Sequence, residues 1–344
     1  MTSRTRAVAV VAALAALLTA CGNPPRRPDP SVVSPPRLAA TFDLQAHRGG
    51  MALTTENTLE AFGRALDLGV TTLVLEAQVT RDGEVVVAQG PRVNAELCRD
   101  TRPASAPDAD QPYVGKLFRD LTLEQVRTLD CAIDRHPDFE DQRVAEDGRV
   151  PLVREVFALV RERGADIRFD LEITTQPDDP DATVRRTQVV QAVWDVVEDA
   201  GLAERVTVRS FDWSSLVELH SRAPSVPLAA MASSEHLEVG APGASPWLAG
   251  VDVDEVGGDV VRAARMVDGV RVLAPDEGLV GMGLVRRAHE AGLLVVPWTV
   301  DDAPVMKHLI ALGVDGLTTN RPDVLRTVLS DSGLPMPAQY PDGG

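Results

Sequence analysis

The chain of 344 residues has few lysines, a shortage of positive charge, and no long apolar run beyond its N-terminal segment. Without further apolar runs it is not a polytopic membrane protein. Acidic residues outnumber basic ones, 51 to 34, and the formal charge of −17 argues against binding to a nucleic-acid backbone. The two lysines, Lys116 and Lys307, stand in no recognisable motif, so an amine nucleophile has little support.

The N-terminal segment has the features of a secretory signal over residues 1–20. Arg4 and Arg6 precede a small and apolar run from Ala7 to Leu18, which is too short to span a bilayer comfortably. The end of this run, Leu18-Thr19-Ala20-Cys21, resembles the bacterial lipobox, in which the cysteine is lipidated and becomes the first residue of the mature protein. The alternative is a soluble secreted protein that is cleaved near the same point.

Cleavage before Cys21 removes two arginines and leaves 32 basic and 51 acidic side chains, a formal charge of −19. Anionic lipid would repel such a body, so the acyl chains are the expected anchor on the outer face of the cell membrane. Residues 21–40 contain six prolines and are expected to form a stiff, extended tether. An exported chain also meets oxidising conditions, so Cys98 and Cys131 are predicted to form a disulfide, with two separate buried thiols as the alternative.

Short aliphatic runs alternate with longer amphipathic segments from Phe42 onward, a pattern that predicts repeated βα units and a parallel sheet. The predicted strands are 43–46, 72–78, 85–89, 167–173, 206–210, 226–231, 250–253, 270–274, 293–299 and 315–319. The predicted helices are 57–68, 151–163, 182–200, 257–267, 279–291 and 302–312, and glycine follows several of them.

Eight strands remain when 85–89, which follows a hairpin turn, and the weak run 250–253 are set aside. Eight is the number of a closed barrel, so we expect an α/β fold with a single (β/α)8 TIM-type barrel over residues 41–330. A doubly wound open sheet is the alternative. Residues 94–150 are expected to be a long insertion with one helix at 122–129, and residues 331–344 a frayed tail.

Polar residues stand where the predicted barrel strands end, which is the edge of a TIM barrel that carries reactive groups. The first strand ends at His47 and Arg48, and the third barrel strand carries Glu172. Glu76 and Gln78 are two residues apart on one strand and therefore point to the same face, which suits two oxygen ligands of one cation. The sequence thus predicts a site at this edge.

These residues resemble the glycerophosphodiester phosphodiesterase family over nearly the whole mature chain. The resemblance is carried by His47-Arg48-Gly49, Glu56-Asn57-Thr58, the strand at Glu76, Asp82-Gly83 before Val85-Val86-Val87, Leu171-Glu172-Ile173, Ser210-Phe211, Trp298-Thr299-Val300, Gly313-Val314-Asp315-Gly316 and Asn320-Arg321-Pro322-Asp323. It implies a divalent metal, Ca²⁺ or Mg²⁺, held by three acidic groups, here at Glu76, Gln78 and Glu172. It also implies two histidines that exchange protons during attack on phosphorus.

The sequence departs from the family pattern at four positions of the implied site. Gln78 replaces an acidic residue, Gln89 and Gly90 stand where the family has His-Asp, and Thr174 replaces a lysine. Gln78 still offers a carbonyl oxygen to a cation, but it lacks the negative charge of an acidic residue. We therefore expect metal binding to be weakened or absent. Gln89 cannot transfer a proton near neutral pH, and the loss of such a group costs about 10²- to 10⁴-fold in rate.

Each candidate also has a simpler interpretation. His47, the remaining acid/base, could be a core histidine, and Glu76 and Glu172 could be partners of arginines such as Arg48 and Arg168. Arg48 is otherwise the expected phosphate partner. Trp298 could be plain packing or a wall for the glycerol moiety.

Ser210 and His136 are two further residues whose side chains can take part in catalysis. Ser210 lacks the surroundings of a nucleophile. His136, in the insertion, is a candidate replacement for the missing histidine.

Three functions follow. The first is a membrane-anchored, metal-dependent hydrolase that releases glycerol 3-phosphate and an alcohol from small glycerophosphodiesters, with weakened activity. The second is a catalytically silent relative that binds a phosphodiester or a cell-envelope partner. A sphingomyelinase-D-like transferase fits less well, because that chemistry also resembles a two-histidine arrangement.

Overall fold

The computed structural model describes residues 41–343. The predicted signal peptide, the lipidation site at Cys21 and the proline-rich tether lie outside the described residues. None of the helices in residues 41–343 is both long enough and apolar enough to cross a bilayer.

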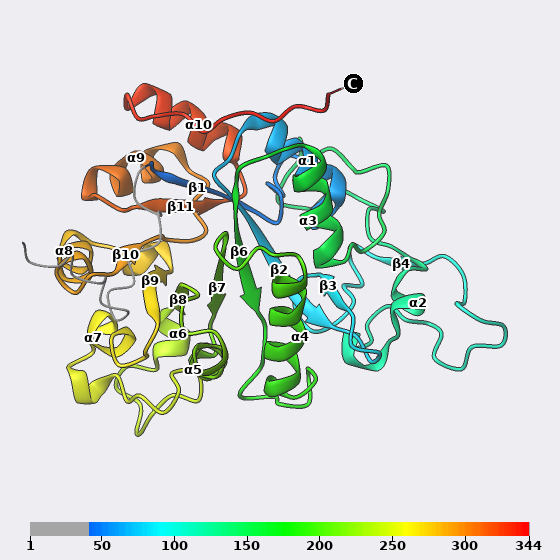
Figure 1. Cartoon of the computed structure of the whole chain (residues 1–344), viewed down its shortest axis with the longest axis horizontal. Helices are drawn as coiled ribbons and strands as arrows, with labels where there is room; N and C mark the ends of the chain where they lie inside the picture. The colour runs from blue at the N-terminus through cyan, green and yellow to red at the C-terminus, as the bar shows by residue number, and fades with distance from the viewer. Residues whose placement is uncertain (1–40, 344) are drawn as a thin grey trace, which may run out of the picture. The chain divides into compact units, whose positions relative to one another are not determined.

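The described residues form a nearly closed barrel of eight parallel strands with helices outside it (Figure 1). The strands follow the order β10-β9-β8-β7-β6-β2-β1-β11. Backbone hydrogen bonds from Asp315 to Val295 and from Thr318 to Pro297 connect the two ends of this path. The single TIM-type barrel is thereby confirmed, and the open doubly wound sheet is wrong. The bounds are β1 (Asp43–His47), β2 (Thr72–Val79), β6 (Arg168–Ile173), β7 (Val206–Ser210), β8 (Leu228–Ala232), β9 (Val270–Pro275), β10 (Leu294–Val295) and β11 (Gly316–Thr319).

The helices mostly lie where the sequence pattern predicts them, and the ends are set by capping side chains. Thr58 and Asp302 accept hydrogen bonds from the first turns of α1 and α9. The bounds are α1 (Leu59–Leu68), α2 (Leu123–Val126), α3 (Val153–Glu162), α4 (Arg186–Asp199), α5 (Trp213–Arg222), α6 (Ser234–Leu237), α7 (Val260–Ala264), α8 (Met282–Glu290), α9 (Ala303–Leu312) and α10 (Pro322–Asp331), with 3-10 turns at Phe118–Asp120, Asp254–Val256 and Glu277–Leu279. Helices α5, α6 and α10 were not predicted from the sequence. The predicted strand at 250–253 is wrong, because these residues form no strand.

Alternate residues of each strand face the helices or the barrel interior. The outward set, such as Leu73 and Leu75 on β2, joins the main apolar core. The inward set is largely polar: Thr318 donates to Gln45, Gln45 donates to Asp43, and Arg209 lies among them. Inward strand residues at the carboxyl end of this polar interior therefore emerge at the candidate site.

The turn after β1 brings the chain close to α1. Gly49 has a φ of 84°, and a Cβ there would lie 2.8 Å from the backbone of Ala61. Only glycine combines this conformation with this approach. His47 and Arg48 are therefore held on a short turn that α1 fixes from behind.

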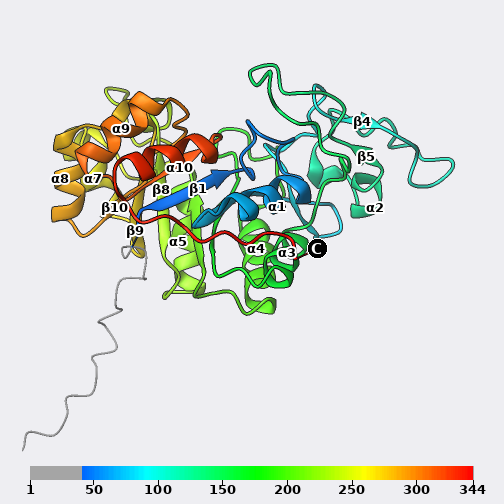
Figure 2. The same ribbon diagram turned by 90° about the horizontal axis from the view of Figure 1, so that it is seen from above.

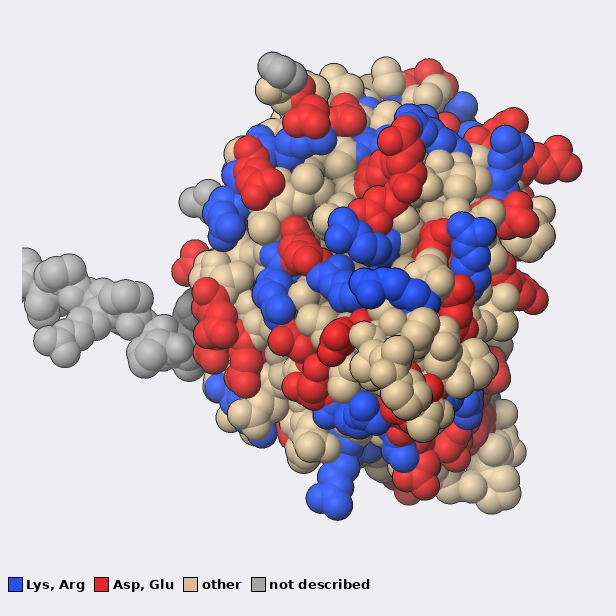
Figure 3. Space-filling model, turned by 90° about the vertical axis from the view of Figure 1, so that its right-hand side faces the viewer, with Lys and Arg blue, Asp and Glu red and all other residues tan. Residues whose placement is uncertain are grey.

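The predicted insertion is present between β3 (Val85–Val87) and α3, and lies on the right in Figure 1. It contains the short strands β4 (Arg99–Asp100) and β5 (Leu129–Asp130) together with α2. A separate apolar cluster, which includes Tyr113, Phe118 and Leu121 of the insertion, forms its interior. Acidic and basic side chains are interspersed over this face of the molecule (Figure 3).

A disulfide joins Cys98 and Cys131 within the insertion, so the structure pairs the two cysteines as the sequence predicts. The bond closes a loop across 33 positions of the chain. Such a link stabilises a fold mainly because it restricts the unfolded chain.

We expect the double variant Cys98→Ser/Cys131→Ser to lose roughly 2 to 4 kcal/mol of unfolding free energy, because its unfolded chain is no longer restricted by the link. Urea unfolding of the oxidised protein and of the variant measures the difference. An unchanged midpoint and slope would show that the disulfide contributes nothing to the fold.

The frayed C-terminal tail is a wrong prediction. The backbone N–H of Tyr340 donates to the carbonyl of Leu66 at the end of α1 (2.9 Å), and Arg163 donates to the carbonyl of Tyr340 (3.1 Å). Figure 2 shows this segment running past α1 toward α3. The tail satisfies polar groups that the helix end leaves open, which a proline-rich sequence does not reveal.

Candidate functional site

A cavity of about 450 Å³ opens at the carboxyl ends of the barrel strands, where the sequence predicts the site. Its polar lining combines strand-end and loop residues, and an aromatic wall completes it. The lining residues are His47, Arg48, Glu76, Gln89, Gly90, Glu172, Ile173, Thr174, Thr175, Gln176, Asp178, Arg209, Phe211, Met231, Glu235, His236, Trp247, Trp298 and Thr299.

His47 is oriented by a chain of hydrogen bonds from the last strand of the barrel. The side-chain amide of Asn320 donates to Asp301 (2.8 Å), so its carbonyl oxygen faces Nδ1 of His47, also at 2.8 Å. The other ring nitrogen, Nε2, lies 3.3 Å from Oε1 of Glu76. Both nitrogens of His47 face acceptors, which is the arrangement of a proton donor.

Arg48 is bound to two carboxylates. Its Nε donates to Oε1 of Glu76 (2.8 Å), and its Nη1 donates to both oxygens of Glu56 (3.2 and 3.3 Å). The interpretation of Glu76 as the partner of an arginine is therefore correct for this structure. Arg168 instead pairs with Asp43 (2.8 Å), far from the cavity lining.

Glu172 pairs with a residue that the sequence analysis missed. Nε of Arg209 donates to Oε2 of Glu172 (3.1 Å), and its Nη1 lies 3.6 Å from Asp170 and 3.4 Å from Oγ1 of Thr318. Arg209 is 1% exposed yet lines the cavity floor. Its place on β7, one residue before the strand end, with inward parity, was the signal that could have identified it.

Glu172 and Glu76, the two buried carboxyls of the cavity lining, differ in their affinity for protons. Burial raises the pKa of Glu172 to about 7, although Arg209 opposes the rise. Burial also acts to raise the pKa of Glu76, but Arg48 and His47 outweigh it and lower the pKa to about 2. Near neutral pH Glu76 is therefore an anion, whereas Glu172 exchanges its proton.

This difference predicts opposite effects of pH on stability. The pKa of Glu172 lies above its ordinary value of 4.5, so its contribution is full below pH 4.5 and is lost as the pH rises through 7. Glu172→Gln should flatten the decline of unfolding free energy between pH 5 and 7, by at most about 1.4 kcal/mol per pH unit. Urea unfolding at pH 5, 6 and 7 gives the slope.

Glu76→Gln is the matched control for this experiment. The contribution of Glu76 is present above pH 4.5 and is lost only as the pH falls toward 2. This variant should lower stability at pH 5, 6 and 7, with a slightly shallower decline than the unmodified protein, because the charge of Glu76 helps to raise the pKa of Glu172. Equal slopes in the Glu172→Gln variant and the unmodified protein would contradict the assignment.

The three residues of the predicted metal site, Glu76, Gln78 and Glu172, do not present their donor atoms to one common point. Gln78 is 2% exposed, is absent from the cavity lining, and has a side-chain nitrogen without a hydrogen-bond partner. Glu76 and Glu172 do lie side by side, paired in register on β2 and β6, but each carboxylate already accepts from a guanidinium. Among residues 41–343 no three His, Cys, Asp or Glu side chains form a group that could hold a metal ion. The arrangement does not fit the three-ligand site expected from the sequence.

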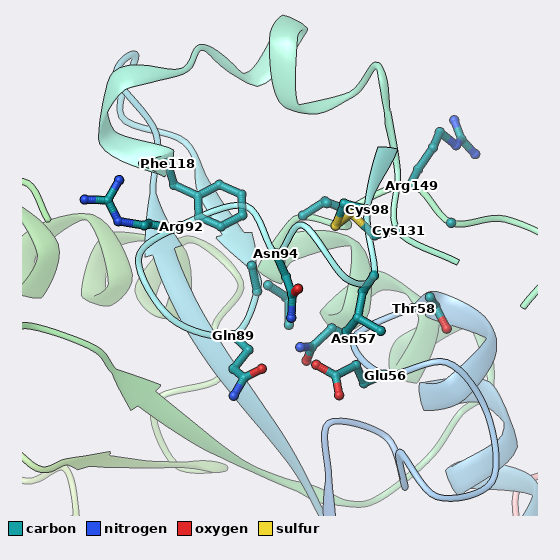
Figure 4. Close-up of a pocket in the computed structure, with 15 residues that line it drawn as sticks. Glu56, Asn57, Thr58, Gln89, Arg92, Asn94, Cys98, Phe118, Cys131 and Arg149 are labelled. Carbon is teal, nitrogen blue, oxygen red and sulfur yellow. A yellow bond between two sulfur atoms is a disulfide. The ribbon is translucent and has the colours of Figure 1, made fainter. Parts of the chain in front are cut away.

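Three of the four departures from the family pattern lie in the cavity lining: Gln89, Gly90 and Thr174. Gln89 also borders a second cavity of about 50 Å³ beneath the insertion, together with Glu56, Asn57 and the disulfide (Figure 4). His136 lies in the insertion outside the cavity lining, where its ring packs against Phe139 (5.2 Å between centroids). The structure therefore does not bring His136 to the position of Gln89.

An aromatic wall forms one side of the cavity. Phe211 stacks on His236 with 4.2 Å between ring centroids and meets the edge of Trp298 at 5.3 Å. Trp247 lies 4.5 Å from His236 in an edge-on arrangement. The sequence pattern identifies neither His236 nor Trp247 as a site residue, because both lie in loops or short helices without a periodic pattern.

A TIM barrel whose cavity joins a positioned histidine with two buried arginines suits chemistry on a phosphate ester. Comparison with known proteins gives the same class, the phosphoric diester hydrolases, which agrees with the enzyme class predicted from the sequence.

The chain belongs to the glycerophosphoryl diester phosphodiesterase family, whose model matches residues 47–324. It is 27% identical to the glycerophosphodiester phosphodiesterase of Caldanaerobacter subterraneus subsp. tengcongensis, over 84% of this chain and 98% of the relative. The enzyme of the same name from Bacillus altitudinis is 26% identical, over 81% and 94%. A solved structure from Silicibacter pomeroyi that carries the family's name has 26% identity and a TM-score of 0.72, over 87% of this chain and 97% of that one.

Proposed function

We propose that the protein hydrolyses small glycerophosphodiesters to glycerol 3-phosphate and an alcohol, more slowly than a member with the complete family pattern. The observation that carries this proposal is the contact of His47 with both Asn320 and Glu76 in the same cavity as Arg48 and Arg209. Family membership and the names of the relatives support the same reaction.

In the proposed reaction, water forms a bond to phosphorus and loses a proton to the solvent, from which His47 is later reprotonated, and the bond from phosphorus to the alcohol oxygen breaks. His47 would donate a proton from Nε2 to the departing oxygen, with Asn320 and Asp301 holding the ring in place. Arg48 and Arg209 would hold the phosphate oxygens. Trp298, whose indole N–H donates to the carbonyl of Ala274 (2.8 Å), is fixed as a substrate-binding wall.

The weakened rate follows from Gln89, which lines the cavity in the place of a second proton-transfer group. No step of the proposed reaction passes through a metal ion, because the donor atoms do not fit one. Enzymes of this family generally depend on a divalent metal, so Ca²⁺ and Mg²⁺ remain part of the test.

The test compares residues 22–344 with the variant Gln78→Asp/Gln89→His/Gly90→Asp/Thr174→Lys on glycerophosphocholine, with Ca²⁺, with Mg²⁺ and with EDTA. We expect measurable but slow release of glycerol 3-phosphate by the natural chain. The variant should be at least about tenfold faster, because it regains a proton-transfer group and a cation. A natural rate within tenfold of the variant would show that the activity is not weakened.

His47→Ala isolates the proton donor. We expect kcat to fall by at least about 10²-fold with little change in KM, whereas His308→Ala, an exposed histidine on α9, should leave both unchanged. An unchanged rate in His47→Ala would remove His47 from the reaction. If the natural chain binds glycerophosphocholine but releases no product, the silent phosphodiester-binding relative is the correct function.

We further propose that the protein is exported and held on the outer face of the cell membrane by acyl chains at Cys21. The support is the sequence Leu18-Thr19-Ala20-Cys21 after a short apolar run. Cys21→Ser should move the protein from the membrane fraction to the soluble exported fraction and abolish labelling by radioactive palmitate. Labelling that persists in this variant would refute the anchor.

A further inference from the structure

The aromatic wall of the cavity is a feature that the proposed reaction uses only through Trp298. Its four rings, Trp298, Phe211, His236 and Trp247, form one continuous series with centroid separations of 4.2 to 5.3 Å. All four are partly buried and all line the cavity that holds His47. Hydrolysis at phosphorus does not require an aromatic surface of this size. We therefore expect the wall to bind another part of the substrate.

The wall lies away from His47 and Arg48, although Phe211 is only two residues after Arg209. In the ring of strands, β8 lies opposite β1, with three strands between them on either path. His47 and Arg48 follow β1, whereas His236 is on α6, directly after β8. The backbone of Trp247 accepts a hydrogen bond from Trp213 at the start of α5, which places it on the same side as His236.

Charge differs between the buried floor of the cavity and its exposed edge. The Lys and Arg side chains that line it are Arg48 and Arg209, both bound to carboxylates at the barrel mouth. Asp178 and Glu235 also line the cavity, are exposed, and are close enough to His236 to influence its titration. Burial lowers the pKa of His236, so near neutral pH the ring is an uncharged member of the wall.

Aromatic faces beside carboxylates attract an organic cation, because the negative face of each ring and the anionic charge act in the same direction. An anion would be repelled by Asp178 and Glu235, whereas a neutral polyol would gain no attraction from their charge. The cavity volume of about 450 Å³ is within the range of small-molecule sites and can hold both ends of one substrate.

We propose that the aromatic wall, with Asp178 and Glu235, is a subsite for an organic ammonium group, so that the cavity selects zwitterionic phosphodiesters whose alcohol is positively charged. This inference rests on the proposed function, because the phosphate of the same substrate would lie on Arg48 and Arg209. It adds the class of the alcohol, which the reaction at phosphorus leaves open.

The experiment measures selectivity with glycerophosphocholine, glycerophosphoethanolamine and glycerophosphoglycerol at one ionic strength. We expect kcat/KM for the choline ester to exceed that for the glycerol ester by at least about tenfold. Trp247→Leu should reduce this ratio by about tenfold, Glu235→Gln should reduce it by a smaller factor, and Trp247→Phe should restore most of it.

Two control variants keep the chemistry of the change but lie outside the cavity. Phe139→Leu removes an aromatic ring in the insertion, and Glu198→Gln removes an exposed carboxylate on α4. Both should leave the ratio unchanged. If Trp247→Leu does not fold, Glu235→Gln decides the question, because Glu235 is exposed and its replacement disturbs no packing.

Calorimetric titration of the His47→Ala protein with intact glycerophosphocholine and glycerophosphoglycerol separates this inference from the proposed function. Tighter binding of the choline ester, relieved by Trp247→Leu, supports the cation subsite even if the natural chain never releases product. Equal binding of the two esters, or a ratio that Trp247→Leu does not change, overturns it even if both esters are hydrolysed.

Discussion

The rest of the site depends on the charge pairing inside the barrel. Arg209, on β7, is almost completely buried, and its guanidinium is bonded to Glu172 and lies near Asp170, both on β6, and near Thr318 on β11. A buried charge that loses its partner is strongly destabilising. The strands β6, β7 and β11 therefore cannot slip in register without separating these groups, and the cavity floor is fixed as firmly as the apolar core outside the barrel.

The same pairing explains why Glu172 and Glu76, neighbours on adjacent strands, behave differently. Glu76 has both Arg48 and His47 as partners, whereas Glu172 shares Arg209 with Asp170, whose own pKa burial raises to about 6. Two arginines thus pair with four buried carboxyls, Glu56 among them, and cannot keep all of them ionised. A proton compensates for the missing cation at Glu172, so the cavity carries less negative charge near neutral pH than its composition suggests.

The barrel could be predicted from the sequence because its signals are local and are not changed by packing. Side chains alternate with a period of two along the strands, and glycines end several helices. It predicted His47, Glu76 and Glu172 for a geometric reason, since strand ends of a parallel barrel meet at one edge. His236 and Trp247 could not be found in this way, because loops place them through contacts between distant segments. Alternation along a strand does not by itself place Gln78 correctly. Gln78 points to the same face of β2 as Glu76, but it lies two residues further along the strand, outside the cavity lining.

The chain keeps the groups that orient one histidine while it lacks those that serve a second. Asp301 and Asn320 still position His47, whereas Gln89, Gly90 and Thr174 offer neither a proton nor a cation. A family match alone does not reveal this division, because function depends on the site and the fold tolerates its loss. Slow turnover with an intact binding cavity is the outcome that these contacts favour over loss of the whole site.

Arg48 is already engaged before any substrate arrives. Its Nε and Nη1 are bonded to Glu76 and Glu56, so a phosphate must approach the remaining donors and share the positive charge with two carboxylates. The arginine needs no reorganisation, but its attraction for an anion is reduced. A site that binds phosphate with reduced strength gains most from a second point of attachment, and the aromatic wall on the opposite side of the cavity can supply one. Binding at the alcohol end would then determine which phosphodiester stays long enough to react.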